Sequence, residues 1–359
     1  MAPDTGASSE ATTRSSELAV TVGYRIDAVP SLVANGASQA SALNADGVVA
    51  GAAQASSGAT RAIRWMPGSN PVDLGTLPGG NTSSATGVNR ALSVVGSAAV
   101  STVASHAFVY AGSGPMKDIG HLDFGGLSPT TQNVSAGGIN DAGVIAGTSP
   151  LQLGAPSFAA YTRAFVWKNG ALTDLGSLGG SNSMASAINS KGWVTGSTAT
   201  PAAAEHAFVW NGGPMMDIGI CDGAASSRGR AINEAGDVAG WCFFPQVNGY
   251  PNGHPAIRHA FLWTANGGMR DLGTLGNRHG DVLGIGADDT VVGFTVASTG
   301  GNVAFIAPAG GAIQNLNDLL PAGSGWTLSE ARAINAQGSI AGVGTLNGVT
   351  RGFVLTPIR

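Results

Sequence analysis

The chain has 359 residues, of which 43% are hydrophobic, 11% are charged and 56 are glycine, and its formal net charge is -4. This balance excludes a largely disordered chain and suits many short strands joined by tight turns. The sequence has no run of Lys and Arg that would attract nucleic acid, and no apolar stretch approaches the roughly 18 residues of a transmembrane helix.

The first 22 residues are polar and lack the hydrophobic segment of a signal peptide. We predict a disordered tail over residues 1–22. Residues 23–359 are expected to form a single domain, because closed all-β folds of this length often form one cooperative unit. An exported protein whose leader had been removed would begin in the same way, so the tail leaves the cellular compartment open.

Seven repeats of about 45 to 55 residues follow the tail. Each contains a hairpin of the form apolar-Asn-x-x-Gly-x-Val-x-Gly. The hairpins begin at Leu43, Val88, Ile139, Ile188, Ile232, Ile285 and Ile334, and those at Val88 and Ile285 are degenerate. Since Asn can bond its own backbone and Gly tolerates positive φ, each copy predicts a strand, a tight turn and a second strand.

Two further strands are predicted in each repeat. The first begins with His or Arg, as in EHAFVW ending at Trp210, and the second carries Asp before Leu/Ile-Gly, as at Asp217. Four strands are the content of one propeller blade. We interpret the recurrent cation and Asp as a structural pair within the blade rather than catalytic groups, because a residue type repeated in every blade serves the blade.

The seventh repeat ends at Arg359 without room for its fourth strand. The segment YRIDAVPSL from Tyr24 resembles that missing strand, with Asp27 in the place of the recurrent Asp. The sequence therefore predicts an all-β fold, a seven-bladed β-propeller closed by its N-terminal strand, in preference to an open β-solenoid.

The two rims of this propeller are expected to differ, because long irregular loops gather on one rim, the usual place for binding residues. The residue three positions before the hairpin Asn is small in four repeats but is Arg230 and Arg332 in two others, with Arg228 and Glu330 two residues earlier. We expect guanidinium groups to gather at the mouth of the axial channel and to match an anionic or polyhydroxylated ligand. The alternative is simple pairing with Glu330, Asp222 or loop carbonyls.

Nearby loops supply further candidates, among them Asp281 of the GNRHGD motif. The predicted ligand-binding residues are Arg228, Arg230, Arg332, Arg278, Asp222, Tyr161, Phe244 and Tyr250. His279 or His254 with Glu330 could act as an acid–base pair if they converge. We predict no metal and no cofactor, because zinc-ligand spacing, a phosphate loop and a dinucleotide fingerprint are all missing from the sequence.

Cys221 and Cys242 are the only two cysteines and are 21 positions apart. Their predicted strands could place them on one rim. Both a disulfide and two buried thiols fit this arrangement.

The motifs HAFVW, DLGTLGG-like segments and AINxxGxVxG resemble the HAF repeat family, described as extracellular bacterial repeats, from Tyr24 to Arg359. The sixth repeat is the weakest match, since Gly286 replaces the hairpin Asn and Val303 replaces the His or Arg. The resemblance implies export and a propeller-like fold but supplies no common catalytic residues. A secreted or periplasmic protein is therefore expected, with the cytoplasm left open.

Two functions of different classes remain. The first is an exported, monomeric binding module that presents its loop-rich rim and axial pocket to a small anionic or sugar-like ligand or to a protein partner. The second is an enzyme, such as a lyase, hydrolase or cyclase, with its active site in the same pocket. The sequence does not decide between them, because propeller enzymes draw their site residues from different blades.

Overall fold

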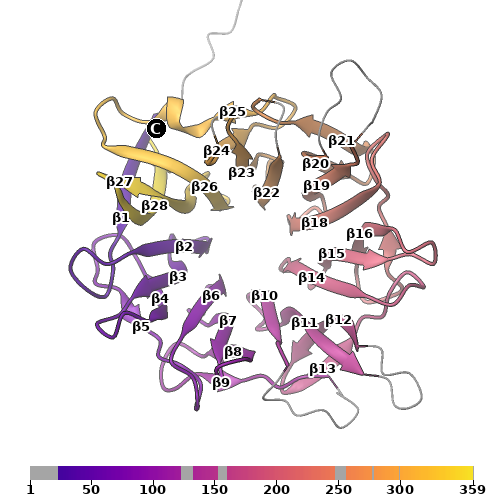
Figure 1. Ribbon diagram of the computed structural model, residues 1–359, viewed down its shortest axis with the longest axis horizontal. Coiled ribbons are helices and arrows are strands. Elements are labelled where there is room, and N and C mark those ends of the chain that lie inside the picture. The colour runs from indigo at the N-terminus through magenta and orange to yellow at the C-terminus, as the bar shows by residue number, and fades with distance from the viewer. Residues whose placement is uncertain are drawn as a thin grey trace, which may run out of the picture.

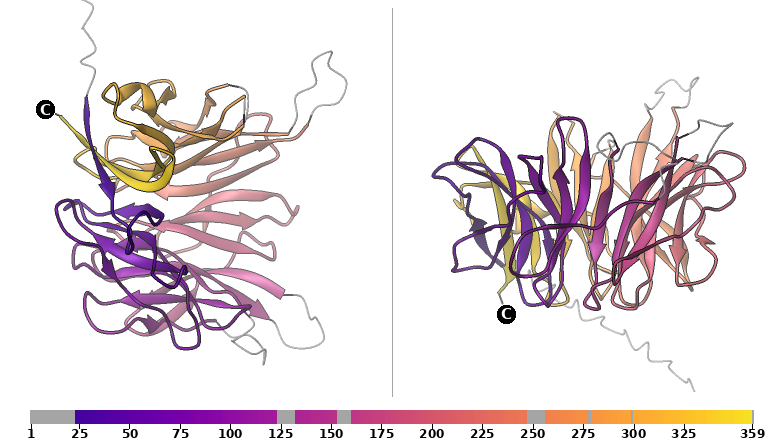
Figure 2. Two further views of the ribbon diagram at one scale, coloured as in Figure 1. Left: turned by 60° about the vertical axis from the view of Figure 1, so that its left-hand side comes forward. Right: turned by 90° about the horizontal axis from the view of Figure 1, so that it is seen from below.

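The computed structural model describes residues 23–122, 132–152, 160–246, 256–276, 279–298 and 300–358. Seven four-stranded antiparallel sheets stand in a ring around a central axis (Figure 1), which confirms the predicted seven-bladed β-propeller. Seen from the side, the strands run between the two faces of the ring (Figure 2). The predicted tail over residues 1–22 lies outside the described residues.

Each of the first six blades is one sheet of four consecutive strands, numbered from the axis outward. Blades 1 to 3 contain β2 (Ser38–Leu43), β3 (Val49–Gln54), β4 (Thr60–Trp65) and β5 (Val72–Asp73); β6 (Ser83–Val88), β7 (Val94–Ala99), β8 (Ser105–Tyr110) and β9 (Lys117–Asp118); and β10 (Ser135–Ile139), β11 (Ile145–Gln152), β12 (Ala160–Lys168) and β13 (Ala171–Asp174). Blades 4 to 6 contain β14 (Ser183–Ile188), β15 (Val194–Ala199), β16 (Glu205–Trp210) and β17 (Met216–Asp217); β18 (Ser226–Ile232), β19 (Val238–Phe244), β20 (Ile257–Thr264) and β21 (Gly268–Gly273); and β22 (Gly280–Ile285), β23 (Val291–Val296), β24 (Asn302–Ala307) and β25 (Gln314–Asn315), followed by the 3-10 helix η2 (Leu316–Leu319).

Blade 7 joins the two ends of the described part of the chain. It contains β26 (Trp326–Ile334), β27 (Ile340–Leu346) and β28 (Val349–Pro357), and β1 (Tyr24–Val29) pairs with β28 as the outermost strand. The indigo β1 lies beside the yellow C-terminal strand in Figures 1 and 2. The predicted closure by the N-terminal strand is confirmed.

The place predicted for Asp27 within that strand is wrong by one residue. In the other blades the recurrent Asp lies opposite the buried residue of the third strand, as Asp118 does opposite Phe108, whereas Ala28 lies opposite Phe353. Asp118 also accepts a backbone hydrogen bond from the turn that follows it, at 2.8 Å. No such turn follows Asp27 to fix its register, and Asp27 pairs instead with Arg25 at 2.9 Å.

The recurrent side chains hold each blade to itself and to its neighbours. The Phe of the third strand is fully buried in blades 2 to 7, at Phe108, Phe165, Phe208, Phe261, Phe305 and Phe353. The His of that strand contacts the Asp of the fourth strand in its own blade, as with His106 and Asp118 at 2.6 Å and His259 and Asp271 at 2.8 Å. The structural interpretation of this pair is confirmed.

A belt of asparagine side chains surrounds the short-turn end of the channel. The hairpin Asn accepts backbone hydrogen bonds from its own turn with Oδ1 and donates with Nδ2 to the carbonyl of the Asn in the next blade. These donations run from Asn44 to Asn89, Asn89 to Asn140, Asn140 to Asn189, Asn189 to Asn233 and Asn335 to Asn44, at 2.9 to 3.1 Å. In blade 6 Gly286 has no side chain to donate onward to Asn335. Asn233 donates to Asp289 at 2.8 Å and to the carbonyl of Gly286 at 3.4 Å.

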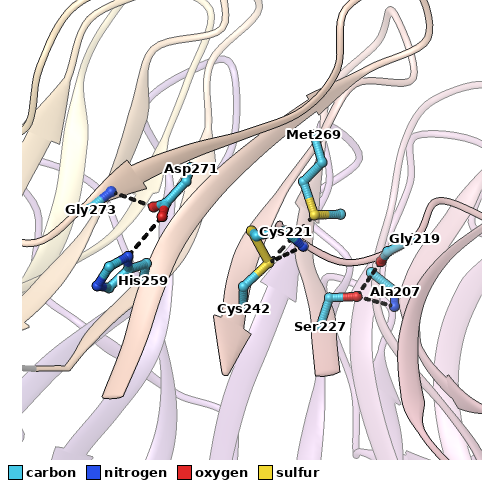
Figure 3. The surroundings of a disulfide bond; sticks show 9 residues. All are labelled: Ala207, Gly219, Cys221, Ser227, Cys242, His259, Met269, Asp271 and Gly273. Atoms are coloured by element: carbon cyan, nitrogen blue, oxygen red, sulfur yellow. Dashed lines mark hydrogen bonds and ion pairs between the residues drawn. A yellow bond between two sulfur atoms is a disulfide. The ribbon is translucent and has the colours of Figure 1, made fainter. Parts of the chain in front are cut away.

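Cys221 and Cys242 form a disulfide with a Cα–Cα distance of 6.0 Å (Figure 3). Both residues are buried and lie close to Met269. Cys221 belongs to the connection between β17 and β18, while Cys242 lies in β19. The bond therefore ties the connection between blades 4 and 5 to the second strand of blade 5. The sequence allowed either a disulfide or two buried thiols, and the disulfide is formed.

Candidate functional site

The channel-facing residues are set by a β-bulge in the innermost strand of every blade. At one equivalent position in each strand the pairing register skips a residue, and β26 has a second skip at Ser329. The residues at the equivalent position are Ser41, Thr86, Gly137, Ser186, Arg230, Leu283 and Arg332. A bulge leaves one residue out of the ladder and re-aims its side chain. All seven residues line the axial channel, so the sequence located Arg230 and Arg332 correctly.

A pocket of about 600 Å³ opens at the long-loop end of this channel. One wall is charged and comes from blades 5, 6 and 7: Arg228, Arg230, Asp281, Glu330 and Arg332. The opposite wall comes from the first four blades and, apart from Met184, carries small side chains: Ser41, Thr86, Ser135, Gly137, Thr148, Ala185 and Ser186. The pocket exists because small residues face large charged ones across the axis.

Two of the five charged groups form a tightly held pair. The guanidinium of Arg332 donates from Nε to Glu330 Oε2 at 2.9 Å and from Nη1 to Gln39 Oε1 at 2.7 Å. Asn302 donates to the second oxygen of Glu330 at 2.8 Å. Arg332 therefore follows the alternative of simple pairing with Glu330, and the pair presents a fixed polar edge to the pocket.

Arg228 is held against an aromatic ring. Its Nη2 donates to Glu205 at 2.6 Å, and its guanidinium lies 5.4 Å from the ring centre of Trp241. Arg258 lies over the same ring at 4.7 Å. A guanidinium is attracted to the face of an aromatic ring, so these contacts help to hold both arginine side chains in place. Trp241 is thus a support of the wall that the sequence analysis did not single out.

Asp281 is the most perturbed titratable group of the wall. Burial raises the pKa of its carboxyl from 3.8 to about 6, an effect that the positive charges of Arg230, Arg258 and Arg228 only partly oppose. Its Oδ1 lies 3.4 Å from Nε of Arg230. A carboxyl with such a pKa can hold or release a proton near neutral pH.

Three buried atoms of the wall find no hydrogen-bond partner among the described residues: Nε of Arg228, Nε of Arg230 and Oδ1 of Asp281. An unmade hydrogen bond of a buried polar group costs about 1–3 kcal/mol. The Arg230 and Asp281 pair is therefore less satisfied than Arg332 with Glu330. It is the part of the wall that a bound polar group can complete with least loss of existing bonds.

Four of the other predicted residues are described, and none of them lines the pocket. His279 is exposed and its Nδ1 accepts from the backbone of Arg258 at 3.1 Å, and no contact among the described residues joins it to Glu330. Phe244 packs on the ring of His259 at 4.6 Å, and Tyr161 lies half-buried in β12. Asp222 is exposed in the turn after Cys221. Arg278, His254 and Tyr250 lie outside the described residues.

Asp281 was predicted to lie in a loop, but the residue belongs to β22. Asp281 precedes Gly286 by five residues, just as Arg228 precedes Asn233. Leu283 and Arg230 likewise each lie three residues before that position of their own repeat. Counting back from the degenerate sixth hairpin would have found both residues.

Within the described part of the chain, no three His, Cys, Asp or Glu side chains are placed to hold a metal ion, and no helix is long and apolar enough to cross a membrane.

No family model and no curated protein matches the chain. Among solved structures it is similar to a puromycin-hydrolyzing peptidase of Mycobacterium tuberculosis, with 10% identity and a TM-score of 0.48 over 88% of this chain and 52% of the peptidase. It is similar to TolB from Acinetobacter baumannii, with 9% identity and a TM-score of 0.44 over 88% of this chain and 64% of TolB, and to a gluconolactonase from Xanthomonas campestris, with 10% identity and a TM-score of 0.40 over 93% and 90%. The chain thus spans about half the length of the peptidase and under two thirds of TolB.

Proposed function

We propose that this protein is an exported binding propeller whose axial pocket holds a small hydroxylated ligand with at most one negative charge. The proposal rests on one observation: five charged side chains from three blades meet in a pocket of about 600 Å³. Arginine and carboxylate side by side accept and donate hydrogen bonds in fixed directions, as recognition of several hydroxyl groups requires.

The charge of the wall limits the ligand. Three arginines face two carboxylates in the pocket, and Arg228 is also paired with Glu205. The wall is therefore close to neutral, and a dianion would be poorly compensated. A sugar acid or another hydroxylated monocarboxylate fits this balance better than a phosphate ester.

Export is supported by two features of the chain. The disulfide between Cys221 and Cys242 is typical of proteins folded in an oxidising compartment. The repeat motifs resemble the HAF family, which is described as extracellular.

An enzyme using the same pocket is the second candidate, and Asp281 favours it. A carboxyl whose pKa is about 6, beside an arginine, can move a proton on a bound hydroxy acid. In this alternative Asp281 is the acid–base group and Arg230 orients the substrate carboxylate.

The test is a thermal-shift screen with sugar acids, neutral sugars and inorganic phosphate, since a ligand of the native state raises the melting temperature. We expect a sugar acid to raise it in the native protein and not in the Arg230→Ala/Arg332→Ala variant. The matched control, Arg25→Ala/Arg270→Ala, removes the same charge at exposed positions and should keep the shift. Retention of the shift in the pocket variant would overturn the proposal, and turnover of a bound hit would select the enzyme.

A further inference from the structure

The pocket continues into the channel rather than ending at the arginines. Arg230, Leu283 and Arg332 line both the pocket and a middle section of about 240 Å³. Ile188, Ile232 and Ile334 line both that section and an opening of about 440 Å³ at the asparagine end. The three spaces therefore follow one another along the axis, and each shares lining residues with the next.

Below the arginines the channel becomes apolar. The residue just before the hairpin Asn, or before Gly286 in blade 6, is aliphatic in all seven blades. These residues form the aliphatic ring: Leu43, Val88, Ile139, Ile188, Ile232, Ile285 and Ile334. The residue above it is Ala or Gly in every blade: Ala42, Gly87, Gly138, Ala187, Ala231, Gly284 and Ala333. No side chain of these two layers bears a polar atom, so water inside them has only the backbone to bond.

The polar wall and the aliphatic ring are close enough for one small molecule to reach both. Arg230 and Ile232 are two residues apart in β18, and so are Arg332 and Ile334 in β26. At the rise of a β-strand this is roughly 7 Å along the axis. A molecule with a charged end at Arg230 would thus place its other end among the aliphatic side chains.

We infer that the ligand is an amphiphilic monoanion: its polar head lies at Arg230 and Arg332, and an unbranched apolar tail runs down the channel into the aliphatic ring. The inference rests on the proposed function, which already places a polar group of the ligand at the arginines. The apolar tail is the new part of the inference. Transfer of a methylene from water into apolar surroundings is favourable by about 0.8 kcal/mol, which is about four-fold in affinity.

The experiment is calorimetric titration of the native chain with butanoate, hexanoate, octanoate and decanoate, with gluconate as a tail-less reference. We expect affinity to rise by up to about four-fold per added methylene until the ring is filled. Ile139→Trp places an indole in the ring, so decanoate should bind it no more tightly than butanoate. Val103→Trp adds the same side chain at an exposed loop position and should retain the full series.

The outcomes separate the two proposals. If gluconate binds through Arg230 and Arg332 while affinity does not depend on tail length, the inference of an apolar tail in the aliphatic ring is wrong and the proposed function stands. If neither gluconate nor any member of the series binds, both are overturned. If Ile139→Trp keeps the dependence on tail length, the tail lies outside the ring and the inference fails. Should Ile139→Trp not fold, Ile188→Ser takes its place, and a smaller gain per methylene is then expected.

Discussion

Asp281 shows how one side chain is set by groups from several blades. The carboxyl lies in β22, its main charged neighbours are on β18 and β20, and burial outweighs them in setting its pKa. Because the pKa is higher in the folded chain than the ordinary value of 3.8, the folded state binds this proton more tightly than the unfolded state. The contribution of Asp281 to stability is then complete below about pH 4 and is lost as the pH rises through about 6.

We predict that Asp281→Asn removes the loss of stability that the Asp281 carboxyl causes as the pH rises. Relative to the variant, the native protein should lose on the order of 3 kcal/mol of unfolding free energy between about pH 4 and pH 7, as a pKa displaced by about two units implies. Urea unfolding of both proteins across this range measures the difference. Asp222→Asn, which removes an exposed carboxylate, should follow the native curve. Parallel curves for the native protein and Asp281→Asn would contradict the assignment.

Comparing the residue three positions before the hairpin Asn in each repeat was enough to find part of the site. Arg230 and Arg332 stand out because the same position is small in the first four repeats, and the bulge there aims them at the axis. Asp281 was assigned to a loop, although Gly286 takes the place of the hairpin Asn in its degenerate repeat and gives the same offset. Trp241 was missed because its role depends on Arg228 and Arg258 lying over its ring, which no spacing along the chain reveals.

At the scale of elements, the hairpin Asn does more than its turn requires. Its sequence pattern predicts the local turn, and Oδ1 of Asn140 indeed accepts from Ala142 and Val144 at 3.1 and 3.0 Å. The donation from Nδ2 to the carbonyl of Asn189 could not be predicted, because it depends on how two blades are placed. The belt therefore couples turn formation within a blade to contact between blades.

We predict that Asn140→Ala lowers the unfolding free energy by about 3 kcal/mol, because three hydrogen bonds of a buried side chain are lost at about 1 kcal/mol each. Asn211→Ala, at an exposed turn, should change it by less than about 0.5 kcal/mol. Equilibrium denaturation of the two variants beside the native chain makes the comparison. Equal effects from the two substitutions would show that the belt contributes nothing beyond the loss of an amide.

For the whole molecule, closure by β1 is the contact with the greatest separation along the chain. Repeats that contact only their neighbours leave two unpaired ends, and a ring removes those ends only if the last sheet is completed. Here β1 pairs with β28 from Tyr24 opposite Pro357 to Val29 opposite Gly352, and Val29 is fully buried. Complementary partial repeats at the two ends of the sequence were sufficient to predict this, although they did not fix the register.

We predict that a chain beginning at Pro30 melts on the order of 5–10 °C below one beginning at Gly23, because it loses the burial of Tyr24 and Val29 and leaves β28 as an unpaired edge. Differential scanning calorimetry measures the melting, and size-exclusion chromatography should show the shorter chain associating through that edge. A peptide of residues 23–30 added in excess should restore melting and the monomer peak, because it can occupy the vacant place beside β28, whereas a scrambled peptide should not. Unchanged melting of the shorter chain would mean that three strands suffice in blade 7, and that the ring is held by contacts between blades rather than by the closing strand.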